Sequence, residues 1–178
     1  MLIIGIGGLP ASGKSTLVKE LRKKLNKPKI FKYGMIKGEH YEPNLYILGT
    51  YNRKFGGTDT LSMAVQPHAE RFIETMKDKH MIVLFEGDRL FNSKFIQKII
   101  DLGIDYKFYM LIADPEIIEQ RHIDRNDTQS EQWLQGRKTK LKTIYEKFVT
   151  QIKLLHNKNK EHLLKNVNMI WQDLKNTI

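Results

Sequence analysis

Cysteine is absent from the chain, and no run of apolar residues approaches the roughly 18 that a membrane span needs. Without cysteine the protein can form no disulfide, no thiolate metal site and no cysteine nucleophile. The six histidines show no metal-ligand spacing. The apolar N-terminal stretch also lacks the basic leader and small-residue cleavage site of a secretory signal peptide. We therefore expect a cytoplasmic protein that does not enter a membrane.

Acidic residues are fewer than basic ones, 20 against 30, which gives the 178-residue chain a formal net charge of +10. Residues 19–37 hold eight Lys or Arg against one acid, residues 137–165 hold nine against two, and residues 38–136 hold eleven against sixteen. The two basic regions can attract a polyanion, because Lys and Arg displace counterions from phosphates. A solvated lysine-rich surface gives the same composition, so both interpretations stay open.

Apolar runs that are typical of buried strands alternate with helical patterns. Strands are expected at 1–7, 29–34, 80–85, 104–113 and 167–171, and helices at 15–25, 61–79, 93–102, from 114 past Arg121, and from 128 to about 156. Thr128 and Glu131 have the spacing of a capping box. Residues 38–58 are expected to form an irregular insert, with a hairpin as its one candidate regular element. The alternation predicts a single α/β domain, residues 1–178, with three layers (α/β/α) and a mainly parallel sheet.

The segment GLPASGKST, residues 8–16, follows the first expected strand and satisfies the pattern G-x-x-x-x-G-K-[ST]. In this pattern glycines bring the backbone close to phosphate oxygens, and the following helix presents unpaired N–H groups and the positive end of its dipole. The candidate nucleotide-binding residues are therefore Gly8, Pro10, Ala11, Ser12, Gly13, Lys14, Ser15 and Thr16. Lys14 is expected to reach the β- and γ-phosphates, and Ser15 to offer its hydroxyl to Mg²⁺. A dinucleotide fingerprint does not fit, because it needs a glycine or alanine where Pro10 stands.

This segment resembles the Walker A loop of the P-loop kinases, above all the small nucleoside, nucleotide and polynucleotide kinases. The resemblance implies a P-loop NTPase fold of the kinase type, with ATP and Mg²⁺ as cofactors. It also implies acids at the end of a neighbouring strand, and IVLFEGDR at residues 82–89 supplies Glu86 and Asp88. Glu86, which stands where the family more often has Asp, can hold Mg²⁺, and Asp88 can accept the proton of an attacking hydroxyl. The alternative is that Asp88 and Arg89 form a surface pair.

Such kinases also carry arginines on a mobile lid, which the resemblance places here at about residues 115–140. Arg121 and Arg125 lie four residues apart on one expected helical face, and Arg137 follows in QGRKTK. Closed over the transferring phosphoryl group, these cations would stabilise its charge and exclude water. The alternative is a helix whose arginines pair internally with Asp124 and Asp127.

The resemblance further places the acceptor in an insert at about residues 38–66. Its aromatic residues can stack on a base and its basic residues can meet phosphate, or the aromatic residues can form local core. These residues are Tyr41, Tyr46, Tyr51, Phe55, Arg53 and Lys54. The glycines at 56 and 57 precede Thr58 and Asp59 at a helix start, where Asp59 can either cap the helix or act as catalytic base. Asp59 is the first candidate for the base and Asp88 the second.

The combination of LGTYNRKFGGTDTLSMAVQP with FEGDR is similar to phage P-loop kinases that phosphorylate the hydroxymethyl group of 5-hydroxymethyluracil in DNA. This resemblance implies a DNA partner, a role in DNA hypermodification and a host-cytoplasm location. A duplex substrate needs a pocket for a displaced base and a basic groove, for which the candidates are Lys138, Lys140, Lys142 and Lys147.

Two other functions fit the same motif. The first is a deoxynucleoside monophosphate or nucleoside kinase, in which Arg53, Arg71 and Arg89 would hold an acceptor phosphate. The second is a nucleotide-hydrolysing switch or non-catalytic DNA-binding module, which needs neither an acceptor pocket nor a lid.

Overall fold

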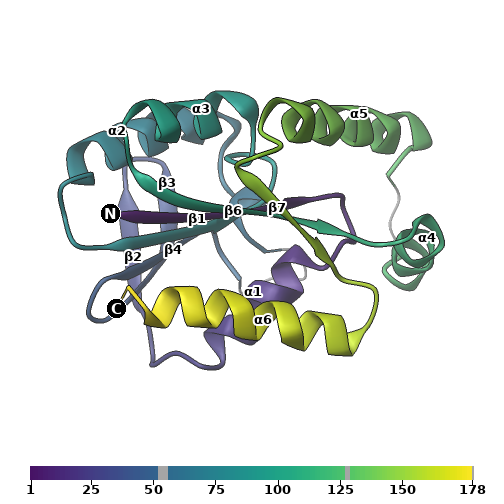
Figure 1. Ribbon diagram of the computed structural model, residues 1–178, viewed down its shortest axis with the longest axis horizontal. Coiled ribbons are helices and arrows are strands. Elements are labelled where there is room, and N and C mark those ends of the chain that lie inside the picture. Colours follow the sequence, from purple (N-terminus) through teal and green to yellow (C-terminus); the bar gives the residue numbers. More distant parts are fainter. Residues whose placement is uncertain (52–55, 127–128, 178) are drawn as a thin grey trace.

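The computed structural model describes residues 1–51, 56–126 and 129–177 (Figure 1). Seven strands form one sheet in the order β2-β3-β4-β5-β1-β6-β7. The strands are β1 (Leu2–Gly8), β2 (Lys29–Tyr33), β3 (Ile36–Tyr41), β4 (Leu45–Leu48), β5 (Ile82–Glu86), β6 (Asp105–Ile112) and β7 (Ile152–His156). The helices are α1 (Lys14–Arg22), α2 (Gln66–Met76), α3 (Ser93–Asp101), α4 (Pro115–Asp124), α5 (Glu131–Lys147) and α6 (Lys160–Lys175), with single 3₁₀ turns at Thr58–Thr60 and Met63–Val65.

Strand β1 lies at the centre of the sheet, and all seven of its residues are buried. It pairs in parallel with β5 on one side and β6 on the other. A strand covered on both faces needs apolar side chains at every position, which explains its continuous apolar sequence. The strand therefore delivers the loop that follows it to the middle of the sheet's carboxyl edge.

Helices cover both faces of the sheet (Figure 1). Ile3 packs on one face with apolar residues of α2, α3 and α5, and Ile4 packs on the other face with those of α1 and α6. Strands β4, β5, β1, β6 and β7 run in parallel, whereas the pairs β2–β3 and β3–β4 are antiparallel. This arrangement confirms the predicted three-layer α/β fold with a mainly parallel sheet.

The segment expected to be an irregular insert contributes two regular strands. Strand β3 pairs with β2 and β4, and β4 then enters the parallel part of the sheet beside β5. The apolar residues Leu45, Ile47 and Leu48 are buried there. The expected hairpin is confirmed by the antiparallel pair of β3 and β4. The irregular structure expected for residues 38–48 was wrong, because Tyr and Gly in this stretch serve sheet packing rather than a loop.

The last part of the chain also differs from the prediction. Residues 167–171 were expected to be a strand but lie inside α6, where Val167, Ile170 and Leu174 are buried at helical spacing. The helix expected to reach residue 156 ends at Lys147, and the real last strand is β7, which pairs with β6. The helix α5 is capped by Ser130, whose hydroxyl accepts from the Trp133 amide. Thr128, expected as the cap, lies outside the described residues.

No helix in the described part of the chain is both long enough and apolar enough to span a membrane.

Candidate active site

The segment 8–16 contains the last residue of β1, the loop at residues 9–13 and the first residues of α1. Ala11 is buried with a φ of 61°, a left-handed conformation that is uncommon for any residue but glycine. Gly13 has a φ of +98°, and a Cβ atom there would lie 2.3 Å from Nδ2 of Asn157. Only glycine fits this position, because Asn157 packs against the loop and donates to the Ser12 carbonyl oxygen at 2.7 Å. The loop is thus held in one shape by the segment after β7.

Lys14 begins α1 and is 8% exposed. Its Nζ atom donates to the carbonyl oxygens of Gly8 at 2.8 Å and Leu9 at 2.9 Å. The ammonium group is therefore held over the loop that precedes the helix. A helix N-terminus combined with a fixed cation is a site for an anion such as phosphate.

Ser15 and Glu86 meet behind Lys14, at the ends of α1 and β5. Ser15 Oγ donates to Glu86 Oε1 at 2.7 Å, and Glu86 is 1% exposed. Burial raises the pKa of Glu86 to about 7; Lys14 and Ser15 oppose this rise, whereas Asp59 and Asp88 add to it. The side chain is therefore poised between its neutral and charged forms near neutral pH.

A hydroxyl and a carboxylate are the oxygen ligands that suit Mg²⁺, so Ser15 and Glu86 fit this ion. No cluster of three or more His, Asp or Glu side chains with metal-binding geometry exists among the described residues. This protein site therefore needs further oxygen ligands from nucleotide phosphates, as is usual for Mg²⁺.

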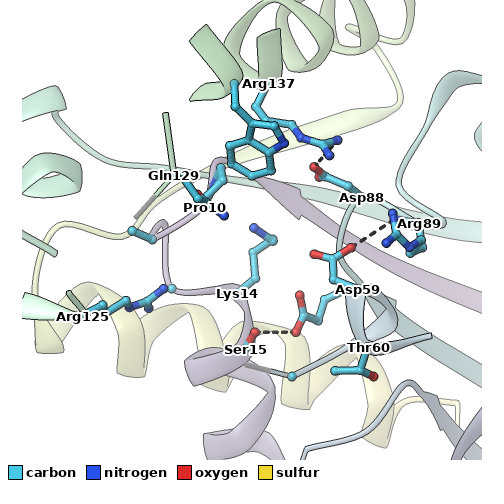
Figure 2. Close-up of a pocket in the computed structure, with 15 residues that line it drawn as sticks. Pro10, Lys14, Ser15, Asp59, Thr60, Asp88, Arg89, Arg125, Gln129 and Arg137 are labelled. Carbon is cyan, nitrogen blue, oxygen red and sulfur yellow. Dashed lines mark hydrogen bonds and ion pairs between the residues drawn. The ribbon is translucent and has the colours of Figure 1, made fainter. Parts of the chain in front are cut away.

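Asp59 lies in the 3₁₀ turn Thr58–Thr60, which is fastened to the end of β5. Thr58 Oγ1 donates to the Glu86 carbonyl oxygen at 2.8 Å, and Asp59 Oδ1 accepts from the Arg89 amide at 3.2 Å. Removal from water and the nearby Asp88 carboxylate raise the pKa of Asp59. Asp59 and Asp88 lie together on one side of Lys14, opposite Arg125 (Figure 2).

Helix α5, in the region expected to form a lid, brings Arg137 close to Asp88. Arg137 Nη1 forms an ion pair with Asp88 Oδ2 at 2.8 Å, and its guanidinium carbon lies 4.7 Å from the centre of the Trp133 ring. The pair connects α5 to the end of β5 across the cavity mouth (Figure 2). Cation and aromatic ring stabilise each other in this arrangement.

Arg121 has a different place from the one expected for a lid arginine. It does not line the cavity but donates to the carbonyl oxygens of Asn157 at 2.8 Å, Lys158 at 3.2 Å and Ala11 at 3.3 Å, with a longer contact of 3.5 Å to that of Ser12. Burial, followed by the charge of Arg125, lowers the pKa of Arg121. Arg121 therefore fastens α4 to the phosphate loop and to the segment after β7, and contact with a phosphoryl group would require it to move.

A cavity of about 330 Å³ gathers most of the predicted site residues. Those that line it are Pro10, Ala11, Gly13, Lys14, Ser15, Asp59, Glu86, Asp88, Arg125 and Arg137, together with Arg89 from the alternative acceptor site. Gly8, Ser12 and Thr16 belong to the loop but do not line the cavity. Arg71 is exposed on α2 and does not line it either.

The three described aromatic residues of the insert, Tyr41, Tyr46 and Tyr51, do not line this cavity. Tyr41 and Tyr51 are buried in the core, and Tyr46 stacks on His40 with ring centres 4.4 Å apart. Their packing agrees with the alternative of local core. Arg53, Lys54 and Phe55 lie outside the described residues.

Trp133 and Gln129 line the cavity but were not predicted. The sequence does hold a signal for Trp133, because it precedes Arg137 by four residues and thus shares its helical face. Gln129 lies before the helix begins and carries no such signal.

Comparison with known proteins gives a family and a fold. The chain matches the family model P-loop Nucleotide Kinase3 over residues 1–174. No curated protein sequence matches it.

Among solved structures, a gluconokinase from Sinorhizobium meliloti is 12% identical with a TM-score of 0.52, and the match covers 97% of this chain and 94% of that one. A shikimate kinase from Bacteroides thetaiotaomicron is 14% identical with a TM-score of 0.47, covering 98% of each chain. A deoxyadenosine kinase from M. mycoides with bound dATP is 16% identical with a TM-score of 0.45, covering 97% of this chain and 99% of that one. At these identities the likeness concerns the fold.

The family match therefore spans nearly the whole chain and includes the phosphate loop, the acids at the end of β5 and the helices α4 and α5. The chain belongs to the P-loop nucleotide kinase family.

Proposed function

We propose that the protein transfers the γ-phosphoryl group of ATP to a hydroxyl group on a nucleic-acid component, in the presence of Mg²⁺. One observation carries this proposal: Lys14, Asp59 and two lid arginines, Arg125 and Arg137, line a single cavity. A cation for the phosphates, a carboxylate for the hydroxyl proton and further cations for the developing charge are the parts that phosphoryl transfer needs.

Asp59 is the catalytic base in this proposal. Its Oδ1 atom accepts a hydrogen bond from the Arg89 amide at 3.2 Å. Its pKa is raised, so the carboxylate is more basic than that of an ordinary Asp. Asp88 is engaged by Arg137 at 2.8 Å. During transfer, Asp59 takes the proton of the acceptor hydroxyl. The oxygen of that hydroxyl forms a bond to the γ-phosphorus, and the bond between this phosphorus and the ADP oxygen breaks.

Each remaining side chain has a distinct task. Lys14 and Arg125, which both line the cavity, would stabilise the charge of the transferring phosphoryl group, and Arg137 would orient Asp88 through their ion pair. Ser15 and Glu86 would hold Mg²⁺, which offsets phosphate charge when it is bound.

The acceptor in this proposal is the hydroxymethyl group of 5-hydroxymethyluracil in DNA. The sequence resemblance of residues 48–67 and 85–89 to phage kinases of that kind supports it, as does the net charge of +10. Trp133 adds an aromatic ring, 37% exposed, to the cavity wall. A ring in this position can stack on a displaced base.

A deoxynucleoside monophosphate kinase is the second candidate. Arg89 favours it, because it lines the cavity beside Asp59 and Asp88 and can meet a small acceptor phosphate. The two candidates share the donor site and differ only in the acceptor.

Incubation with labelled ATP and Mg²⁺ against nucleosides, monophosphates, plain DNA and hydroxymethylated DNA separates these functions. We expect label in hydroxymethylated DNA alone. Transfer to monophosphates but never to polymer would reject the DNA acceptor, and release of ADP and phosphate without transfer would reject the kinase.

The base is tested by Asp59→Asn with Asp88→Asn as its matched comparison. Asp59→Asn should lower kcat by roughly 10²- to 10⁴-fold and leave nucleotide binding intact. Asp88→Asn should act mainly through loss of the Arg137 contact. Normal turnover in Asp59→Asn would contradict the assignment.

A further inference from the structure

A second hollow lies at the edge of the sheet, between β7 and α6. Its volume is about 650 Å³, roughly twice that of the reaction cavity. Three lysines, Lys153, Lys158 and Lys165, and two histidines, His156 and His162, line it. No Asp or Glu of the described residues does so. We call this hollow the β7 groove.

The positive charge of the β7 groove is only partly compensated. Lys158 Nζ pairs with Asp114 at 2.9 Å on its rim. The side chains of Lys153 and Lys165 are exposed and have no ion-pair or hydrogen-bond partner in the part of the chain that the structure describes. Asp173, the acid of the neighbouring hollow, is already bonded to Lys107 and Tyr109. The groove therefore presents unpaired cations to solvent.

The backbone around the groove is fixed by polar contacts. Asn166 is 6% exposed, and its Nδ2 donates to the carbonyl oxygen of His156 at 2.8 Å. The Lys158 amide lies 3.4 Å from Nδ1 of His162, which accepts from it. These bonds tie α6 to the end of β7, so the lysines on the two elements keep their relative positions.

Protection of a free sheet edge accounts for only one of these lysines. Strand β7 is the last strand of the sheet, and a lysine on an edge strand discourages pairing with another chain. Lys153 fits that role. Lys158 and Lys165 lie outside the strand, and their convergence on the same hollow needs another explanation.

Arg121 bridges the β7 groove and the reaction cavity. It donates both to the carbonyl oxygen of Ala11, which lines the cavity, and to that of Lys158, which lines the groove. A polymer bound in the groove would therefore lie near the cavity.

We propose that the β7 groove binds the sugar-phosphate backbone of a DNA duplex. Lysines are strongly hydrated point charges on flexible stems, suited to phosphates but not to reading bases. The groove would supply sequence-independent affinity, and the reaction cavity would select the modified base. The part that concerns the polymer acceptor rests on the proposed function.

The test measures binding of the full chain to an unmodified, labelled DNA duplex of about 20 base pairs by fluorescence anisotropy over a salt series. Lys153→Gln/Lys165→Gln removes the two unpaired charges. Lys77→Gln/Lys79→Gln is the matched control, because it removes two exposed lysines between α2 and β5, and neither lysine lines the groove. Circular dichroism and thermal unfolding check that both variants fold.

The groove variant should weaken binding and reduce the slope of log K against log salt by about 1.8, since each lost phosphate contact removes about 0.9. When salt is raised from about 50 to 200 mM, the groove variant should therefore lose about tenfold less affinity than the wild-type protein loses. The control should keep the wild-type slope. Equal effects of the two variants, or no change in slope, would overturn the proposal.

Two competition experiments add further outcomes. Polyglutamate that displaces the duplex as well as DNA of equal charge would assign the groove to an acidic peptide and overturn the proposal. Displacement by saturating ATP and Mg²⁺ would assign it to the nucleotide site and also overturn it.

The result is separable from the proposed function, because an unmodified duplex offers no acceptor hydroxymethyl group. Duplex binding at the groove without any transfer to hydroxymethylated DNA would reject the proposed function alone. If the groove proposal and the proposed function are both correct, Lys153→Gln/Lys165→Gln should raise KM for hydroxymethylated DNA. The same variant should leave kcat for this DNA unchanged at saturating concentration.

Discussion

The two walls of the reaction cavity differ in how firmly the fold holds them. The wall formed by the phosphate loop carries Lys14 and Ala11, which are 8% and 4% exposed, and contacts from Asn157 and Arg121 hold the loop in place. The lid wall is the first half of α5, which is largely exposed. The buried residues of that helix, Leu141 and Ile144, both lie in its second half.

Under the proposed function, this difference predicts a donor site that is formed before substrate binds and an acceptor site that is completed by the substrate. Preformed cations and dipoles stabilise a transition state without reorganisation. A segment with few buried contacts opens at low cost, and closure of such a segment on substrate excludes water. The ion pair of Arg137 with Asp88 is the contact that joins the loosely packed half of α5 to β5.

The largest expected effect is that of Lys14→Met. Loss of the cation over the loop should lower kcat by roughly 10²- to 10³-fold, because it removes charge stabilisation from a buried position. Labelled-ATP transfer measures the effect, and Lys23→Met, an exposed residue just after α1, serves as control. A loss below about tenfold would contradict the view that the donor wall carries most of the charge stabilisation.

The second effect concerns stability and pH. Burial raises the pKa of Glu86 to about 7 from an ordinary 4.5. Between these values the folded protein binds more protons than the unfolded chain, so the free energy of unfolding falls as pH rises through this window and levels off above it. The contribution of Glu86 is on the order of 3 kcal/mol.

Urea unfolding of the ligand-free protein at about pH 5 and about pH 8 tests this prediction. Glu86→Gln should lose this part of the pH dependence, whereas Glu119→Gln, on the exposed side of α4, should retain it. Equal pH dependence in the wild-type and Glu86→Gln proteins would show that Glu86 is charged throughout, and that the donor wall is less buried than we describe.

The strand, loop and helix that form the phosphate-loop wall could be predicted because their signals are local. An apolar run, a phosphate-binding motif and a helical pattern follow one another within residues 1–25. The acids at the end of β5 were also found, because the carboxyl ends of parallel strands share one edge of the sheet. The same reasoning predicted the α/β layers.

The C-terminal part was harder to predict because its patterns are ambiguous. The run at residues 167–171 is rich in β-branched and aromatic residues, which favours a strand, and only the longer spacing from Val167 to Leu174 reveals the helix. Strand β7 is five residues long and follows a helical pattern without a glycine or proline between them. The role of Arg121 could not be predicted, since its acceptors are backbone atoms brought near only by folding.

The third effect tests how the lid wall is attached. Arg137→Ala removes the ion pair with Asp88 and the contact with Trp133. We expect kcat/KM for the acceptor to fall about tenfold, the scale of one charge-assisted hydrogen bond, with nucleotide binding unchanged. Arg137→Lys keeps the charge but not the planar group, so it should recover only part of the activity. If nucleotide binding fell equally, the two walls would not be independent.

The smallest effect is that of Gly136→Ala in α5. A Cβ atom there meets nothing within 4 Å, and alanine in a helix interior is more stable than glycine by roughly 0.5–1 kcal/mol. Thermal unfolding should therefore shift upward by about 2–4 °C at most, with slower amide exchange near residue 136 and unchanged turnover.

Gly103→Ala is the matched comparison, because a Cβ atom there also meets nothing within 4 Å but φ is +64°. It should lower stability, since only its backbone conformation opposes a side chain. If Gly136→Ala raises the free energy of unfolding and Gly103→Ala lowers it, backbone conformation rather than the space around the added Cβ atom decides the effect. A fall in kcat for Gly136→Ala with unchanged nucleotide affinity would instead show that α5 must bend at this residue during lid closure. The contrast between the two walls would then come from the bending of α5 as well as from its sparse packing.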